Sequence, residues 1–397
     1  MSQPHAQYPK KIPQVQIPAP GSLYPSAFEI AYREAGYWTE ETFSQLAENL
    51  AARFGDAEAL VGQDCTGNAV RLSYRDLFLA SNQRAETLLE AGIRESDRVV
   101  VQLPNIVEYL IDVLALFRIG ALPVFALIAH RRSEIEHFIN ASGARAFITT
   151  TAHAGYNHSE LALKLSQDYP ELVTLIHDGS FNAEEHQIDV PASSVAANAV
   201  AFLQVSGGTT GLPKLIPRTH ADYLYSVRAS ANICALDRRT RFLVALPASH
   251  NFTMSSPGIL GVLHAGGTVV FTLDPSPTAV ADVIEAEGIT MTAAVPPLAM
   301  TWMNIIPLLQ KDISSLEVLQ VGGAKFPPEA ARRVSETLGC KLQQVFGMAE
   351  GLVNYTRLDD EENRVIHTQG RPISPDDEIL VVDDAGAEYP QESAGIC

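Results

Sequence analysis

The order of apolar and polar positions alternates along this chain between a helical period and short runs typical of strands. Residues 74–91 place apolar side chains at helical spacing, after the capping residue Ser73 and before Gly92. A second helical segment is expected at 106–118. The strands expected around it are 98–103, 122–126, 144–150 and 173–177. Strands and helices that alternate in this way predict parallel sheets covered by helices.

A polar stretch at residues 178–198 separates these elements from a second series. The strands expected in the second series are 199–205, 242–246, 268–271, 291–294 and 318–321. The predicted fold class is therefore α/β, with two parallel-sheet sub-domains layered with helices, a division that the length of 397 residues also favours. The predicted parts are an N-terminal arm at 1–36, a first α/β sub-domain at 37–190, a second at 191–370 and a final segment at 371–397.

The charge balance limits the partners that the protein can have. Lysine and arginine number 28 against 46 aspartate and glutamate residues, a formal net charge of −18. This acidity argues against nucleic acid or an anionic membrane surface as the main partner. The most apolar stretch, 99–129, is interrupted by Glu108, Asp112 and Arg118, which predicts a buried strand–helix–strand unit rather than a membrane span. The cysteines form no CxxC pair and the N-terminal residues lack the apolar core of a signal peptide, so we expect a cytoplasmic protein.

A segment rich in glycine and hydroxyl residues follows the apolar run that ends at Val205. Its residues are Ser206, Gly207, Gly208, Thr209, Thr210, Gly211, Leu212, Pro213 and Lys214. Glycines let backbone N–H groups approach an anion, while the hydroxyls add donors and the lysine adds positive charge, so this segment can cradle a triphosphate. It is not a Walker A loop, because Leu212 and Leu215 stand where that motif needs glycine and a hydroxyl residue. The alternative is an ordinary glycine-rich surface turn.

This segment resembles the signature phosphate loop of the adenylate-forming superfamily, which includes acyl-CoA ligases, luciferase-like enzymes and the adenylation domains of peptide synthetases. The resemblance implies the activation of a carboxylate by ATP. It also makes Lys214, beside the phosphates, a candidate catalytic residue. The resemblance extends through further segments, from about Tyr37 onward.

Two more segments resemble the nucleotide site of that superfamily. In the stretch 343–350, the resemblance implies that Phe346 packs on the adenine, with Val345 and Gly347 beside it, and that Glu350 helps to bind Mg²⁺. Mg²⁺ keeps much of its water, so one carboxylate together with phosphate oxygens is a reasonable ligand set. Considered alone, Glu350 is more typical of a solvated residue at the start of a helix. The other segment, expected to line the nucleotide pocket, comprises Gly322, Gly323, Ala324 and Lys325.

The stretch 250–258 resembles the aryl-acid pocket of ligases that serve catecholate, enterobactin-like siderophore pathways. The resemblance implies that Asn251 lies beside the carboxylate and ortho hydroxyl of the acid and that Phe252 packs on its ring. It implies that Ser256 bonds to a 3-hydroxyl and that Val321 leaves room for that group, which favours 2,3-dihydroxybenzoate over salicylate. The remaining residues expected at this pocket are His250, a candidate catalytic residue and gate, and Val345, Gly347 and Met348. From the local sequence alone, Ser256 could instead be a helix N-cap ahead of Pro257.

The resemblance implies a reaction with two halves. The acid attacks the α-phosphate of ATP to give aryl-AMP and pyrophosphate, and the aryl group then passes to the phosphopantetheine thiol of an aryl carrier protein. In this family a small β-barrel, which 371–397 would begin, and a C-terminal domain with a catalytic lysine follow, so we expect this sequence to be a truncated and impaired form. The alternatives left open are a salicylate–AMP ligase, an aryl-CoA ligase and a non-catalytic fragment that only binds ligand.

Overall fold

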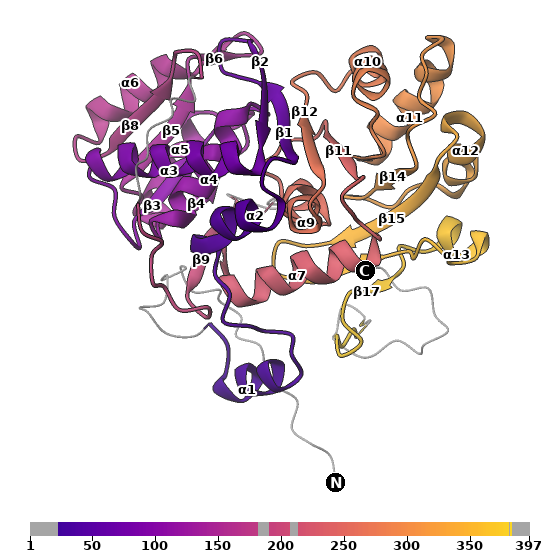
Figure 1. Ribbon diagram of the computed structural model, residues 1–397, viewed down its shortest axis with the longest axis horizontal. Helices are drawn as coiled ribbons and strands as arrows, with labels where there is room; N and C mark the ends of the chain where they lie inside the picture. The colour runs from indigo at the N-terminus through magenta and orange to yellow at the C-terminus, as the bar shows by residue number, and fades with distance from the viewer. Residues whose placement is uncertain (1–22, 182–189, 207–212, 381, 383–397) are drawn as a thin grey trace.

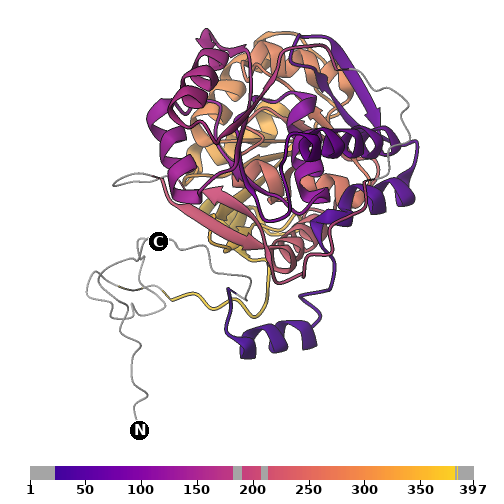
Figure 2. The same ribbon diagram turned by 90° about the vertical axis from the view of Figure 1, so that its left-hand side faces the viewer.

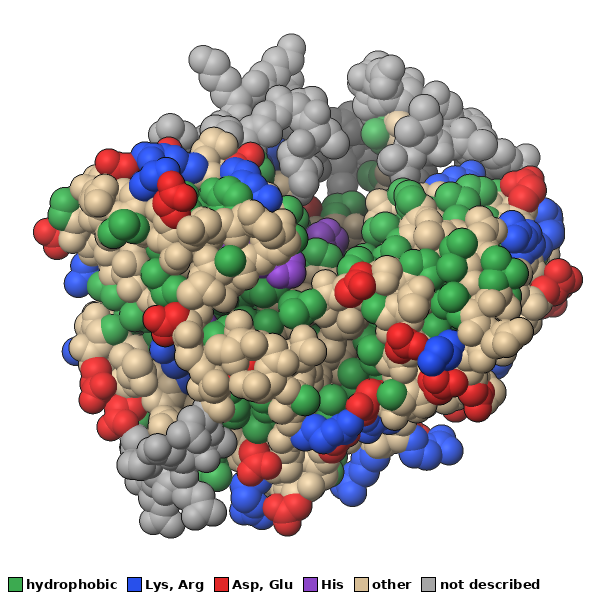
Figure 3. All heavy atoms as spheres, turned by 90° about the horizontal axis from the view of Figure 1, so that it is seen from above, with side chains coloured by type: hydrophobic (Ala, Val, Ile, Leu, Met, Phe, Trp, Pro, Cys, Tyr) green, Lys and Arg blue, Asp and Glu red, His purple; other side chains and the backbone are tan. Residues whose placement is uncertain are grey.

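The computed structural model describes residues 23–181, 190–206, 213–380 and 382, and these residues form two large sheets with helices around them (Figure 1). Strands from the first half of the chain dominate one lobe, and strands from the second half dominate the other. The predicted α/β fold class is confirmed. Seen from above, the surface is hollowed between the lobes, and histidine side chains lie at the hollow (Figure 3).

The first sheet has six strands in the order β10-β9-β4-β3-β5-β8. Their bounds are β3 (Arg98–Val101), β4 (Leu122–Phe125), β5 (Ala146–Thr150), β8 (Val173–His177), β9 (Val200–Val205) and β10 (Leu215–Thr219). Every pairing is parallel except that of β9 with β10. The helices beside this sheet are α4 (Val107–Arg118), α5 (Arg132–Ser142) and α6 (His158–Asp168), and a small hairpin, β6 (Ala152–His153) with β7 (Tyr156–Asn157), precedes α6.

The second sheet has nine strands in the order β17-β16-β15-β14-β13-β11-β12-β1-β2. The bounds are β1 (Glu58–Gln63), β2 (Ala69–Ser73), β11 (Arg241–Val244), β12 (Thr268–Phe271), β13 (Met291–Ala294), β14 (Val318–Val321), β15 (Lys341–Gly347), β16 (Val353–Tyr355) and β17 (Arg371–Pro372). The strands from β15 through β12 to β1 run parallel, and antiparallel strands close both edges. The helices of this half are α7 (His220–Ile233), α8 (Asn251–Ser255), α9 (Gly258–Ala265), α10 (Pro277–Glu287), α11 (Pro296–Ile305), α12 (Pro328–Leu338) and α13 (Glu362–His367).

The sequence signals explain several of these elements. The helix expected at 74–91 is α3 (Tyr74–Glu90), and Ser73 caps it as predicted, since its hydroxyl accepts from the Asp76 N–H while the Asp76 carboxylate accepts from the Ser73 N–H. All strands expected in the two series are present, with ends that shift by a few residues. The stretch 99–129 folds as the expected strand–helix–strand unit, and α4 at its centre is buried along its whole length. No helix within the described ranges is long and apolar enough to cross a membrane.

The strand order does not follow the division that we predicted near residue 190. Strands β9 and β10, from beyond that point, join the first sheet, while β1 and β2, from before it, join the second. Within the predicted arm at 1–36, residues 26–34 form α1 (Ser26–Glu34), which lies apart from both sheets (Figures 1 and 2). The short helices η1 (Phe43–Gln45) and α2 (Leu46–Phe54) follow it. The predicted domain boundaries therefore stay a prediction, with both sheets drawing strands from both sides.

One apolar core joins the two lobes. Side chains of the first sheet, such as Phe125 and Phe202, and of the second, such as Phe242 and Phe271, belong to the same buried cluster. The helices α4 and α9 contribute most of their apolar residues to it. A continuous core of this kind fixes the two sheets against each other, because separating them would expose a large apolar area to water.

Candidate active site

The predicted site segments follow the carboxyl ends of parallel strands. The stretch 250–258 comes after β11, the glycines at 322 and 323 come directly after β14, and residues 348–350 come after β15. Because these three strands run parallel in one sheet, their carboxyl ends meet at the same edge. This arrangement explains why segments about a hundred residues apart in sequence share one site.

Contacts between the three segments are direct. A Cβ placed on Gly322 would lie 3.1 Å from Phe252 Cζ and 2.9 Å from the carbonyl oxygen of Val345. The Asn251 side-chain amide donates to the carbonyl of Met348 at 3.4 Å. The structure thus brings Asn251, Phe252, Gly322, Val345 and Met348 together.

The side chain of Asn251 is held in one orientation. Its Oδ1 accepts a hydrogen bond of 2.8 Å from the hydroxyl of Tyr223, a fully buried residue of α7. Its Nδ2 faces the Met348 carbonyl on the other side. An amide fixed by a donor and an acceptor presents a defined edge to a ligand, whereas a free amide would rotate. Tyr223 was not among the predicted site residues, because a tyrosine on an amphipathic helix is ordinarily a core residue.

His250 forms the N-cap of α8, and its Nδ1 accepts a hydrogen bond of 3.2 Å from the backbone N–H of Phe252. One side of the residue faces solvent, but the protein atoms around the ring desolvate it and lower its pKa. Burial of this kind favours the neutral imidazole. The bond to Nδ1 leaves the proton of the neutral ring on Nε2, which can then donate to a ligand oxygen.

Ser256 and Val321, which the sequence predicts to select the ring hydroxyl of the acid, are both buried. Ser256 is not the N-cap of the following helix: α9 begins at Gly258 after Pro257, and no side chain caps it. The alternative role for Ser256 is therefore wrong. Instead, Ser256 lies beside the buried hydroxyl of Tyr355, whose pKa burial raises far above the usual value for tyrosine.

The phosphate loop is described only at its two ends, since residues 207–212 lie outside the described residues. Ser206 and Lys214 close its base: the Ser206 N–H donates to the Lys214 carbonyl at 2.9 Å, and the Lys214 N–H donates to the Ser206 hydroxyl at 3.2 Å. His137 of α5 bonds through Nε2 to the Pro213 carbonyl at 2.9 Å. The Lys214 side chain is exposed. The base of the loop is therefore fixed, with its lysine free to face a ligand.

Most of the remaining residues that we predict to bind the nucleotide are exposed at the surface. Residues 323–325 are exposed after β14, and Met348 and Glu350 are exposed after β15. Gly347, the last residue of β15, is also exposed, while Phe346 is half-buried. The turn that carries Glu350 is closed by a bond of 3.0 Å from the Met348 N–H to the Leu352 carbonyl. Within the described residues the Glu350 carboxylate has no ion pair or hydrogen bond, and no group of three or more His, Cys, Asp or Glu side chains could hold a metal ion. The other ligands of a Mg²⁺ ion at Glu350 would therefore be phosphate oxygens and water.

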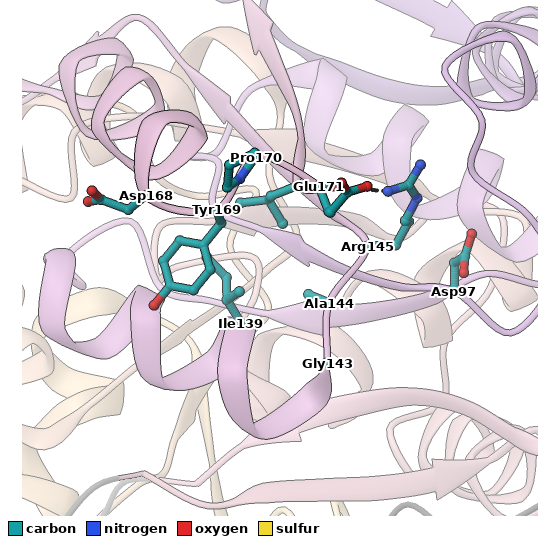
Figure 4. Close-up of a pocket in the computed structure, with 10 residues that line it drawn as sticks. Asp97, Ile139, Gly143, Ala144, Arg145, Asp168, Tyr169, Pro170 and Glu171 are labelled. Atoms are coloured by element: carbon teal, nitrogen blue, oxygen red, sulfur yellow. Dashed lines mark hydrogen bonds between the residues drawn. The ribbon is translucent and has the colours of Figure 1, made fainter.

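A cavity of about 450 Å³ lies away from these segments (Figure 4). It opens at the amino ends of β3, β5 and β8, the opposite edge of the first sheet, where the Arg145 guanidinium donates to the Glu171 carbonyl. It contains none of the predicted site residues. Ligands of open parallel sheets bind at the carboxyl ends of the strands, so this cavity is not a candidate for the reaction site.

Comparison with known proteins identifies the family. Residues 47–396 match the family described as AMP-binding enzyme. A 2,3-dihydroxybenzoate-AMP ligase of Bacillus subtilis (strain 168) is 50% identical over 91% of this chain and 67% of its own length. Enterobactin synthase component E of Escherichia coli (strain K12) is 41% identical over 95% of this chain and 70% of its own. The salicyl-AMP ligase / salicyl-S-ArCP synthetase of Mycobacterium tuberculosis (strain ATCC 25618 / H37Rv) is 40% identical over 91% of this chain and 66% of its own.

Solved structures agree with these relatives. The apo structure of Mycobacterium smegmatis MbtA has a TM-score of 0.84 and 41% identity, over 92% of this chain and 68% of that one. The N-terminal domain of FACL13 from Mycobacterium tuberculosis has a TM-score of 0.75 at 20% identity, over 88% of this chain and 86% of that one, which is a likeness of fold alone. The chain thus has the fold of the large N-terminal domain of adenylate-forming enzymes and spans about two thirds of the length of its relatives. It belongs to the AMP-binding enzymes, a family of adenylate-forming ligases that use ATP.

Proposed function

We propose that this protein activates 2,3-dihydroxybenzoate with ATP, to form 2,3-dihydroxybenzoyl-AMP and pyrophosphate. The observation that carries the proposal is the meeting of three segments at the carboxyl ends of β11, β14 and β15, where Tyr223 and the Met348 carbonyl fix the amide of Asn251. Ser256, in the same segment as Asn251, and Val321, the last residue of β14, are both buried. An amide suits a carboxylate with a neighbouring hydroxyl, and a small hydroxyl side chain suits a second ring hydroxyl. The relatives that carry 2,3-dihydroxybenzoate in their names support this choice of acid.

Each remaining residue has a role in this proposal. Phe252 packs against the ring of the acid, while Phe346, with Val345 and Gly347, holds the adenine beside the segment 322–325. The backbone of 206–211 and the Lys214 ammonium neutralise phosphate charge as the acid carboxylate attacks the α-phosphate and pyrophosphate leaves. Positioning and charge neutralisation account for most of the catalysis in phosphoryl and adenylyl transfer. Neutral His250, with its proton on Nε2, donates a hydrogen bond to an oxygen of the acid or the phosphate.

Mg²⁺ fits the residues at Glu350, whose carboxylate is exposed and has no protein partner within the described residues. When bound, the ion would neutralise phosphate oxygens and lower the charge that the attacking carboxylate meets. Glu350 would hold it at the edge of the nucleotide pocket. We also propose a cytoplasmic location, with which the free thiols of Cys65, Cys234 and Cys340 are compatible.

A second half-reaction is part of the same proposal. The aryl group of the adenylate passes to the phosphopantetheine thiol of an aryl carrier protein, and siderophore synthesis is the use that the named relatives favour. Salicylate is the second candidate acid, because a salicyl-AMP ligase is also among the relatives. Coenzyme A is the alternative acceptor, and a protein that binds ligand without catalysis is an outcome of the test below.

The test compares two non-hydrolysable aryl-adenylate mimics, 2,3-dihydroxybenzoyl and salicyl, by calorimetric titration and thermal unfolding of this chain. A mimic at a hundred times its Kd should stabilise the folded chain by about 2.7 kcal/mol. Stronger binding of the dihydroxy compound is the expected result. Equal or reversed preference would overturn the choice of acid, and failure to bind either mimic would overturn the proposed function. Acid-dependent exchange of pyrophosphate into ATP, measured alongside, separates an enzyme from a binding fragment.

A further inference from the structure

The side chain of Arg218 lies buried beneath the candidate site and contacts two of its parts. It stands near the end of β10, only 4% exposed. Its Nε and Nη2 donate to one carboxylate oxygen of Asp222 at 2.9 and 2.5 Å. Its Nη1 donates to the carbonyl of Ala349 at 2.9 Å. One guanidinium therefore holds the first turn of α7 and, at the same time, the residue that precedes Glu350.

Asp222 is itself fixed by other bonds. Its second carboxylate oxygen accepts from the N–H of Thr219 at 2.9 Å and from the Thr219 hydroxyl at 3.1 Å, and the Asp222 N–H donates back to that hydroxyl. This reciprocal pattern is a capping box that defines the start of α7. Tyr24 donates to the same oxygen at 3.0 Å. Because Asp222 cannot move without breaking the helix start, the guanidinium that it binds has a fixed position.

The next residue of α7 extends this arrangement to the acid pocket. The guanidinium carbon of Arg218 lies 4.9 Å from the centre of the Tyr223 ring, within the range of a cation–π contact. The Tyr223 hydroxyl, at the far end of that ring, donates to Asn251 Oδ1 at 2.8 Å. A continuous set of contacts thus runs from Ala349 through Arg218 and Tyr223 to Asn251.

We propose that Arg218 and Tyr223 are positioning residues that align the two substrate sites. Arg218 sets the backbone at Ala349, next to the proposed Mg²⁺ ligand Glu350, and Tyr223 sets the amide of Asn251 against the acid. The inference rests on the proposed function and deepens it. Alignment matters because attack of a carboxylate on the α-phosphate depends steeply on the distance and angle between two ligands that bind separately.

The planar fork of arginine is what this position requires. Arg218 directs two nitrogens at a carboxylate and a third at a carbonyl on another segment. A lysine ammonium is a single point of charge on a flexible stem and cannot hold both acceptors at these separations. Buried ion pairs are a weak source of stability compared with apolar packing, so stability alone does not account for this side chain.

The test uses two variants, Arg218→Lys and Tyr223→Phe, each with a matched control. Arg118 is also a buried arginine that bonds a carboxylate, Glu48, and a carbonyl, Val190, but it lies at the end of α4. Arg118→Lys is therefore the control for Arg218→Lys. Tyr74 is a second buried tyrosine with a hydrogen-bonded hydroxyl, which donates to the backbone carbonyl of Gly267 at 2.6 Å. Tyr74→Phe is therefore the control for Tyr223→Phe.

Calorimetry measures the Kd of ATP and of the 2,3-dihydroxybenzoyl-adenylate mimic, and chemical denaturation measures stability. We expect Tyr223→Phe to weaken the mimic about three- to ten-fold and to leave ATP unchanged, since one hydrogen bond to Asn251 is lost. Arg218→Lys should weaken both ligands. The two controls should lower stability without changing either Kd.

The other possible results separate a failure of this inference from a failure of the proposed function. If the parent chain binds the mimic and both site variants behave like their controls, the inference is overturned while the proposed function stands. If Tyr223→Phe weakens ATP as much as the mimic, the tyrosine acts on the fold in general and the inference is also overturned. If the parent chain binds neither ligand, the proposed function fails, and the inference fails with it.

Discussion

Gly322 is a residue where a single methyl group would disturb the proposed acid pocket. It follows β14, and a Cβ there would lie 2.9 Å from the Val345 carbonyl oxygen and 3.1 and 3.2 Å from two carbons of the Phe252 ring. The carbonyl belongs to a paired strand and also accepts from Gln369, so it cannot retreat. Residue 322 itself must therefore shift, and the Phe252 ring, which we propose contacts the aryl acid, must give by a few tenths of an ångström.

We expect Gly322→Ala to have two effects. Overpacking of this kind costs about 1–3 kcal/mol of unfolding free energy. The shifted ring should also weaken the aryl-adenylate mimic more than it weakens ATP, because Phe252 is proposed to contact only the acid. Urea denaturation measures the first effect and calorimetric titration with both ligands measures the second.

The control for this substitution is Gly179→Ala. A Cβ on Gly179 would meet no atom within 4 Å, and its φ lies outside the positive range, so the added methyl group has room. This variant should match the parent in stability and in both Kd values. If Gly322→Ala also matched the parent, or if it weakened ATP and the mimic equally, the packing of Phe252 against the acid would be refuted.

Three further changes have defined outcomes. His220 is buried, its Nδ1 accepts a hydrogen bond from the Phe43 N–H, and burial lowers its pKa to about 4. The unfolding free energy should therefore fall by up to about 3 kcal/mol from this group as the pH drops from 6.5 towards 4. His220→Asn should show a weaker pH dependence in denaturation, and equal slopes for variant and parent across this range would contradict the assignment. Ser256→Ala should reduce the preference for the dihydroxybenzoyl over the salicyl mimic about ten-fold in calorimetry, and an unchanged ratio would remove Ser256 as a selector. Glu350→Gln should weaken ATP binding only when Mg²⁺ is present, and an equal loss in the presence of a chelator would exclude a role in metal binding.

The sign of the pH effect follows from where the proton is bound. The folded chain holds His220 neutral down to about pH 4, whereas the unfolded chain takes up a proton near the ordinary pKa of histidine. Below that value the unfolded state binds more protons, so acid favours unfolding. The contribution of His220 to the unfolding free energy is therefore complete above pH 6.5 and is lost as the pH falls towards 4.

Local patterns in the sequence predict elements well and their arrangement poorly. The strands β3 and β14 were expected because each is a short apolar run between turn-forming residues, and α3 because its cap and its period agree. The pairing of β1 with β12, across about two hundred residues, leaves no local sign. Strands that are buried on both faces have interchangeable apolar runs, so nothing in the run itself identifies the neighbouring strand.

The site shows the same division between local and distant information. Asn251, Phe252 and Ser256 are predicted from one continuous stretch, because its likeness to a known pocket is itself local. Tyr223 was missed, since only the fold places its hydroxyl 2.8 Å from Asn251. The helix cap proposed for Ser256 failed for a structural reason as well: the helix starts after Pro257, and the serine is buried at the end of the helix before it.

The proposed site is divided between the two sheets, and this division makes their junction part of the chemistry. The ends of the phosphate loop belong to β9 and β10 of the first sheet, whereas the acid pocket lies at the ends of β11, β14 and β15 of the second. The distance between the two ligands therefore depends on contacts that cross from one sheet to the other, and the bond from Arg218 in β10 to the carbonyl of Ala349 after β15 is one of them. A change at this contact should alter the alignment of acid and ATP in addition to weakening the binding of each. Loss of catalytic rate should consequently exceed the loss expected from the two affinities alone.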